Sequence, residues 1–138
     1  MSFSQFRRPA LTAALLSLFA VPAAFAQDLK VDEKEIVKLS KDTAKMAEAE
    51  KKFAATCAAC HGPKGAGLIG PNLTDTHFIN GSSAQAVATS IALGNAKKGM
   101  PAMTPVLGAD GVKMLTAYVM TMKGKNLPGK PPEGKPEK

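Results

Sequence analysis

Residues 57–62 read CAACHG and contain both cysteines of this 138-residue chain, with a histidine directly after the second cysteine. On a helix, Cys57, Cys60 and His61 occupy positions i, i+3 and i+4, so their side chains project from one face. The glycine and proline that follow are expected to end the helix, which leaves the imidazole in its last turn. The stretch therefore predicts two thiols and one imidazole directed at a common site.

Three kinds of site use two cysteines at this spacing: a redox dithiol, a zinc site and a covalent haem attachment. A redox dithiol follows a strand and precedes a helix, whereas here a helical pattern comes first and a glycine-rich loop comes after. Zinc needs four ligands, and His77 is the only histidine outside the motif. Cys-x-x-Cys-His is the attachment signature of haem c, whose iron accepts the histidine. The motif therefore favours one covalent haem c on Cys57 and Cys60, with His61 as a ligand of the iron.

The first 26 residues have the composition of a secretory signal peptide. Two arginines precede an apolar run over residues 10–21, and Ala-Phe-Ala stands before a cleavage point at Gln27. Pro22 interrupts the apolar run, which is shorter than the ~20 residues that span a bilayer. We therefore expect export to the periplasm as a soluble protein, with membrane association only if this segment is retained as an anchor.

Helical spacing of apolar residues occurs in three segments, and no segment alternates as a strand does. The second segment begins at Ser82, where Ser82 and Gln85 match a capping box, and it ends at Gly94. The third covers residues 108–122. The first runs into the cysteine motif on a stripe made of Ile36, Leu39, Thr43, Met46, Glu50 and Phe53. The prediction is an all-α fold with about three main helices and long loops.

Composition divides the chain after the signal segment into three parts. Residues 27–45 are charged and form either a loose leader or a helical extension, residues 46–123 form the domain, and residues 124–138 are a Pro/Gly/Lys-rich tail expected to be flexible. A domain of this size rarely gains more than ~3–5 kcal/mol from its own core. Because the chain lacks tryptophan and keeps few aromatic side chains, a bound cofactor is expected to complete the core.

The stretch from Met46 to Met122 resembles a class I cytochrome c domain. It is most similar to the small c-type domains of cbb-type oxidase subunits and of free periplasmic cytochromes. The resemblance rests on four motifs in the expected order: FAATCAACHG (53–62), GPNLTD (70–75), GMPAM (99–103) and LTAYVMTM (115–122). It implies a small cytochrome c fold whose loops wrap around one covalently bound haem.

The resemblance also implies roles for individual residues around the iron. His61 is the proximal ligand, and its second ring nitrogen donates to the carbonyl of Pro71. Met100 precedes a proline, which biases its backbone to an extended conformation, and the family places its sixth ligand in such a Met-Pro dipeptide. Met103 is the alternative ligand and otherwise packs near the haem. His77 is expected to be a solvated loop histidine and would be the next ligand to consider.

Other residues are expected to build the surrounding core. Phe53 and Tyr118 should bring the first and last helices together, with Ala49 at a position where relatives often have glycine. The wall of the haem pocket is expected to consist of Phe78, Leu73, Ile91 and Leu115.

Two bound axial ligands leave iron no open position, so the resemblance implies an electron carrier and not an enzyme. Removing the signal segment with its two arginines lowers the formal net charge from +7 to +5, and nucleic-acid binding is not expected. Lys64, Lys97 and Lys98 lie on loops that should border the haem edge and steer the protein to acidic partner surfaces. The partner would be a dehydrogenase donor or a terminal oxidase acceptor. The alternative function is a haem sensor or small-ligand binder in which the methionine is displaced.

Overall fold

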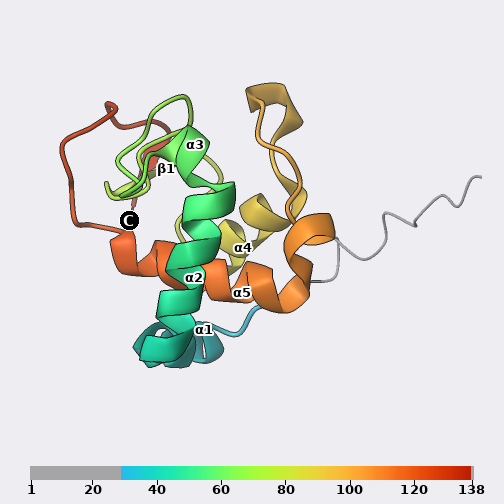
Figure 1. Ribbon diagram of the computed structural model, residues 1–138. Helices are drawn as coiled ribbons and strands as arrows, with labels where there is room; N and C mark the ends of the chain where they lie inside the picture. Colours follow the sequence, from blue (N-terminus) through green and yellow to red (C-terminus); the bar gives the residue numbers. More distant parts are fainter. Residues whose placement is uncertain (1–28, 138) are drawn as a thin grey trace, which may run out of the picture.

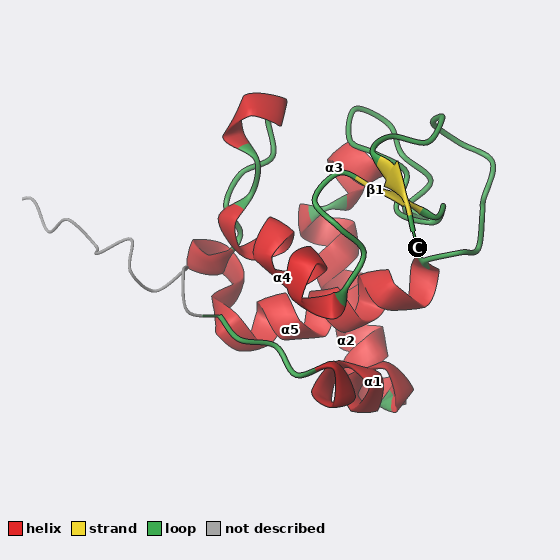
Figure 2. Ribbon diagram, turned by 180° about the vertical axis from the view of Figure 1, so that it is seen from behind, coloured by secondary structure: helices red, strands yellow, loops and turns green. Residues whose placement is uncertain are grey.

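The computed structural model describes residues 29–137, and the predicted signal segment lies outside this range. Helices dominate, as predicted, and long loops gather at one end of the molecule (Figures 1 and 2). The helices are α1 (Glu33–Lys41), α2 (Thr43–Thr56), α3 (Ala58–His61), α4 (Ala84–Leu93) and α5 (Thr104–Met122), with a 3-10 turn η2 (Ala96–Lys98). One antiparallel pair of very short strands, β1 (His77–Phe78) and β2 (Lys135–Pro136), was not predicted from the sequence.

The stripe that runs into the cysteine motif is divided between two helices. Asp42 has an extended backbone between α1 and α2, and its carboxylate accepts the N–H of Lys45 at 3.0 Å, which caps α2. α1 packs on α5, where Ile36 is buried beside Ala117. The segment before the domain is therefore a separate docked helix rather than a loose leader.

Helices α2 and α5 cross at the contact that the sequence predicted (Figure 1). Ala49 and Phe53 are fully buried in α2, and the ring of Phe53 lies 5.5 Å from that of Tyr118, centroid to centroid, with the planes tilted by 57°. This separation and tilt are those of a favourable aromatic pair. The methyl group of Ala49 is accommodated at the crossing.

The ends of α4 agree with the prediction at one terminus and differ at the other. Gly94 ends the helix, as expected. The N-cap is Ser83, whose hydroxyl accepts the N–H of Ala86 at 3.2 Å, so the predicted capping box at Ser82 is wrong by one residue. Gln85 instead bonds to the backbone of the segment before α1, accepting the N–H of Val31 at 2.8 Å. Two adjacent serines offered the same cap chemistry, and this tertiary contact of Gln85 is not visible in the sequence.

Helix α5 consists of a short first turn and a long second part. Gly108 has a φ of 65° and a ψ of 174°, which interrupts the helix. The predicted start of the third helix at residue 108 therefore matches the long part. Its buried face includes Val112, Leu115 and Val119.

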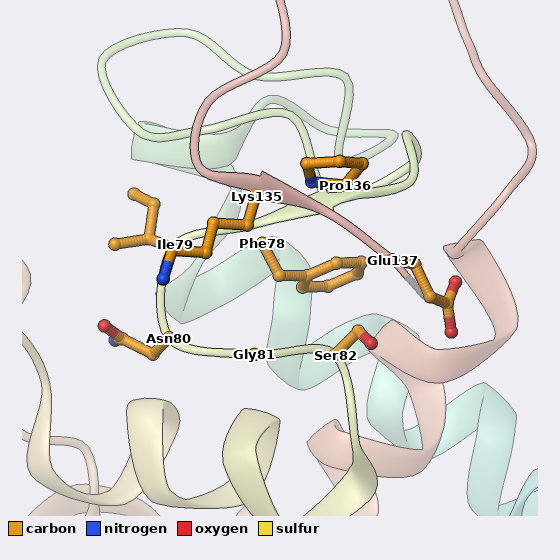
Figure 3. A pocket seen from close by; sticks show the side chains of 8 residues that line it. All are labelled: Phe78, Ile79, Asn80, Gly81, Ser82, Lys135, Pro136 and Glu137. Carbon is orange, nitrogen blue, oxygen red and sulfur yellow. The ribbon is translucent and has the colours of Figure 1, made fainter.

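The expectation of a flexible C-terminal tail is wrong. Residues 123–137, called here the C-terminal strap, lie against the loop between α3 and α4, and β2 pairs with β1 (Figure 3). Gly129 approaches so closely that a Cβ there would lie 2.0 Å from the carbonyl oxygen of Ala66. The backbone N–H groups of Asn126, Lys130 and Glu137 donate to the carbonyls of Thr74, Ala66 and Thr76 at 2.7, 2.9 and 2.8 Å.

The reason for the error is physical. A segment rich in proline, glycine and lysine cannot bury a core of its own, which is what its composition reports. Its order comes from backbone hydrogen bonds to a long loop whose own polar groups need partners. Composition carries no information about such partners.

Truncation after Lys125 is therefore expected to destabilise the domain. Losing several backbone hydrogen bonds at about 0.5–1.5 kcal/mol each, offset by the released chain entropy, should lower the free energy of unfolding by about 1–3 kcal/mol. Denaturant melts of the haem-bearing protein followed by circular dichroism measure this. Removal of Lys138 alone is the control, and Gly129→Val should reproduce part of the loss by clashing with Ala66. Identical melts for the truncated and full chains would contradict the docked strap.

Candidate haem site

The cysteine motif lies where α2 ends and α3 begins. Cys57 is the last residue to continue the path of α2, and the N–H of His61 donates to its carbonyl at 2.9 Å. The motif is thus helical, as its spacing required. Cys57, Cys60 and His61 all line one cavity, in which Cys57 is half-buried, Cys60 is exposed and His61 is buried. The three groups therefore meet at a single site.

The cavity has mostly apolar walls, built from segments far apart in the sequence. The four wall residues expected from the resemblance, Leu73, Phe78, Ile91 and Leu115, all line it. Phe53 of α2 and Val119 of α5 also line it, so the cavity borders the contact between these two helices. Its volume is about 230 Å³. An apolar space of this kind, with few polar groups, is typical of a cofactor site.

The imidazole of His61 is held by the loop that follows it. Its Nδ1 lies 2.9 Å from the carbonyl oxygen of Pro71, the contact expected from the resemblance. An N–H at Nδ1 donates to that carbonyl, which leaves Nε2 as the nitrogen available to a metal. Gly70 allows the close approach, because a Cβ there would lie 2.9 Å from Cε1 of the ring.

The two thiols differ in environment. Burial raises the pKa of Cys57, while a hydrogen bond with the hydroxyl of Thr56 at 3.3 Å lowers it and the nearby Cys60 raises it further. Both sulfurs are free of disulfide bonds. Cys57 is therefore a neutral thiol at pH 7 in the folded chain, and Cys60 is the more accessible of the two.

The three candidates for the second ligand of the iron, Met100, Met103 and His77, all line the cavity. Met103 is buried and packs in the main core. Met100 is half-buried in a loop, where it exchanges backbone hydrogen bonds with Asn95 at 2.8 and 3.0 Å. His77 is half-buried on β1 rather than solvated, and its Nδ1 is buried without a hydrogen-bond partner in the described part of the chain. The geometry brings all three candidates to the site.

The three lysines expected at the haem edge are placed differently from one another. Lys98 lines the cavity, whereas Lys64 and Lys97 are exposed on neighbouring loops and do not. Lys98 also pairs with Glu133 of the C-terminal strap at 3.9 Å. One of the three thus borders the cavity directly.

Sequence reasoning missed two residues beside the cavity. Ile69 lines the cavity although its side chain is 80% exposed. Asn72 is buried, and its side chain accepts the N–H of Thr74 at 2.8 Å and donates to the carbonyl of Leu127 in the strap at 3.3 Å. The resemblance assigns a role to the adjacent Pro71, but the sequence offers no signal that the asparagine contacts the C-terminal strap.

The described helices include none that is long and apolar enough to cross a membrane. This finding covers residues 29–137 and leaves the apolar run of the first 26 residues outside it.

Comparison with known proteins adds a family and a fold. The family model described as cytochrome c oxidase, cbb3-type, subunit III, matches residues 44–119. The chain is 36% identical over 88 residues to the cbb3-type cytochrome c oxidase subunit CcoP of Rubrivivax gelatinosus, covering 62% of this chain and 29% of that protein. It is 41% identical over 76 residues to the subunit FixP of Rhizobium meliloti (strain 1021), covering 52% of this chain and 26% of that protein. The chain thus spans less than a third of the length of these relatives.

A solved structure agrees in architecture. Cytochrome cL from the marine methylotrophic bacterium Methylophaga aminisulfidivorans MPT superposes with a TM-score of 0.54 over 67% of this chain and 66% of that one, at 19% identity. At this identity the likeness is one of fold.

Proposed function

Because the chain belongs to the family of cbb3-type cytochrome c oxidase subunit III, we propose that it is an exported one-electron carrier whose iron is ligated by His61 and Met100. Membership in this family of class I c-type cytochromes implies a covalently bound haem c and haem-based electron transfer. Ligation of the iron by His61 and Met100, and export of the protein, are what we propose beyond this membership.

The observation that carries the proposal is the hydrogen bond from His61 to Pro71 inside an apolar cavity whose lining includes both cysteines. The residues fit the group: two thiols available for bonds to the macrocycle, an oriented imidazole, and mostly apolar walls. The haem supplies one-electron chemistry at its iron. The carbonyl of Pro71 fixes the ring orientation and increases the basicity of the ligating nitrogen.

Met100 is favoured as the second ligand by its place in the chain. It lies in a loop of short-range hydrogen bonds, where a flexible thioether can move toward the iron without disturbing a helix. Met103 is already used by the main core. A thioether ligand favours ferrous iron and raises the reduction potential, as does a dry pocket. Both properties suit an electron carrier.

The proposed partners follow from charge and from the relatives. Lys98 at the cavity and the exposed Lys97 beside it present positive charge, which would steer the protein to acidic surfaces with rates that fall as salt rises. The named relatives are subunits of cbb3-type oxidases, so a terminal oxidase is the favoured electron acceptor. A dehydrogenase donor is the other partner that the proposal requires.

A spectrum of the periplasmic fraction, combined with a denatured-haem assay, tests cofactor linkage and location together. The expected result is one covalent haem per chain, in that fraction, with an absorption band from methionine bound to ferric iron. Carbon monoxide provides the second test. The reduced carrier should bind it slowly and incompletely at neutral pH, because the methionine must leave first. Rapid and complete binding would instead support a sensor or small-ligand binder.

A further inference from the structure

The C-terminal strap contacts the loops on both sides of the haem cavity. On the side of His61 it bonds to the loop that carries Pro71: Asn72 donates to the carbonyls of Leu127 and Lys130, at 3.3 and 3.5 Å. The Nζ of Lys130 also donates to the carbonyl of Ile69 at 2.8 Å. These bonds lie on either side of the carbonyl that orients the imidazole. The strap is thus anchored firmly to the proximal wall.

The contact with the opposite wall runs through Glu133. One carboxylate oxygen pairs with Nζ of Lys130 at 2.6 Å, and the other lies 3.9 Å from Nζ of Lys98. Ile69 and Lys98 both line the cavity. A continuous series of polar contacts therefore runs from the proximal loop, through Lys130 and Glu133, to the loop that carries Met100.

The loop on the far side has little else to hold it. Its backbone hydrogen bonds within residues 95–100 are local, and residues 96–99 are exposed. Figure 1 shows this segment, around η2, extending away from α4 and α5. A segment with few buried contacts opens at low free-energy cost. A contact with another segment, such as the C-terminal strap, is therefore able to change how often this loop opens.

We propose that Glu133 is a positioning residue: by tethering Lys98 to the anchored strap, it holds the loop of residues 95–100, and with it Met100, closed over the haem. The inference rests on the proposed ligation by Met100. Glu133 thereby influences how readily the methionine leaves the iron, and so how far the centre behaves as a carrier or as a ligand binder.

The expected size of the effect follows from how exposed the ion pair of Lys98 and Glu133 is. The side chains of Lys98 and Glu133 are 55% and 32% exposed, and exposed ion pairs are weak because water and salt screen them. Loss of the tether should therefore change the equilibrium between open and closed loop by about 1.4- to 5-fold. The pair is also open to screening by salt.

The test compares Glu133→Gln with Glu48→Gln in the haem-bearing full-length protein. Glu48 is a matched control, because it also contacts two lysines, Lys45 at 3.7 Å and Lys52 at 3.6 Å, but on the exposed face of α2. Both substitutions remove one negative charge. The first readout is the affinity of the ferric protein for imidazole, followed by loss of the methionine band. The second is hydrogen exchange of the amides in residues 95–100.

Glu133→Gln should raise the imidazole affinity by about 1.4- to 5-fold and speed exchange in this loop by a similar factor, whereas Glu48→Gln should change neither. High salt should raise the affinity of the unsubstituted protein toward that of Glu133→Gln. Equal behaviour of the two variants, or no change in either readout, would overturn the tether. Absence of the methionine band in the unsubstituted protein would overturn ligation by Met100 instead, while loop exchange would still decide whether the strap holds the loop.

Discussion

Replacement of both Cys57 and Cys60 by alanine is expected to give a chain without covalent haem that does not fold cooperatively. In this variant the apolar walls of the cavity would enclose nothing. The macrocycle would no longer cover the apolar side chains that line the cavity, such as Ile91, Leu115 and Val119, and each methylene left in water forgoes about 0.8 kcal/mol. Losing several such contacts is comparable with the ~3–5 kcal/mol that a core of this size rarely exceeds. The net free energy that favours the folded state is therefore expected to be lost together with the cofactor.

Mass spectrometry of the purified chain shows whether haem is attached, and thermal melts followed by circular dichroism show whether folding is cooperative. The single variant Cys60→Ala is the control, since one thioether bond and the ligand His61 remain and the cavity stays filled. A compact double variant that melts cooperatively with native helix content would contradict this account.

The second large effect is expected from Met100→Ala. Removing the thioether takes away a ligand that prefers ferrous iron and admits water to the pocket, so the reduction potential should fall and external ligands should bind. The absorption band from methionine on ferric iron should vanish. Potentiometric titration and the ferric spectrum measure both changes.

Met103→Ala is the matched comparison, because Met103 lines the same cavity from within the core. It should cost packing, about 2–5 kcal/mol of unfolding free energy for a buried methionine, while the band survives. Loss of the band in Met103→Ala with retention in Met100→Ala would transfer the ligand role to Met103. Retention in both would point to His77 as the next ligand to test.

The parts of this site that the sequence predicted are those in which local spacing determines geometry. Cys57, Cys60 and His61 share a face because a helical turn brings positions i, i+3 and i+4 together, and that turn is present. The end of α4 at Gly94 and the aromatic contact of Phe53 with Tyr118 were likewise recoverable. In each case the information lies within a few residues or in a strongly apolar pattern.

The features that escaped prediction depend on contacts between distant segments. The division of the first helical stripe is a local exception, because Asp42 caps α2 by accepting the N–H of Lys45, three residues further on, although the apolar spacing continues across it. The order of the C-terminal strap depends on partners such as Thr74 and Ala66, far away in the sequence. Asn72 joins the two regions with side-chain hydrogen bonds. No propensity or periodicity within either segment encodes such pairings.

The crossing of α2 and α5 bears on the order in which this chain is made and folded. Phe53 and Tyr118 come from opposite ends of the domain. Their contact therefore closes one large loop that contains most of the domain. The entropy cost of closing a long loop opposes such a contact until other interactions offset it. Contacts between residues far apart in the sequence therefore make folding slow. Haem fastened to Cys57 and Cys60 would already sit at the end of α2 when α5 arrives. We therefore expect attachment to precede closure, so that biogenesis, rather than affinity for a finished pocket, determines whether the native protein forms.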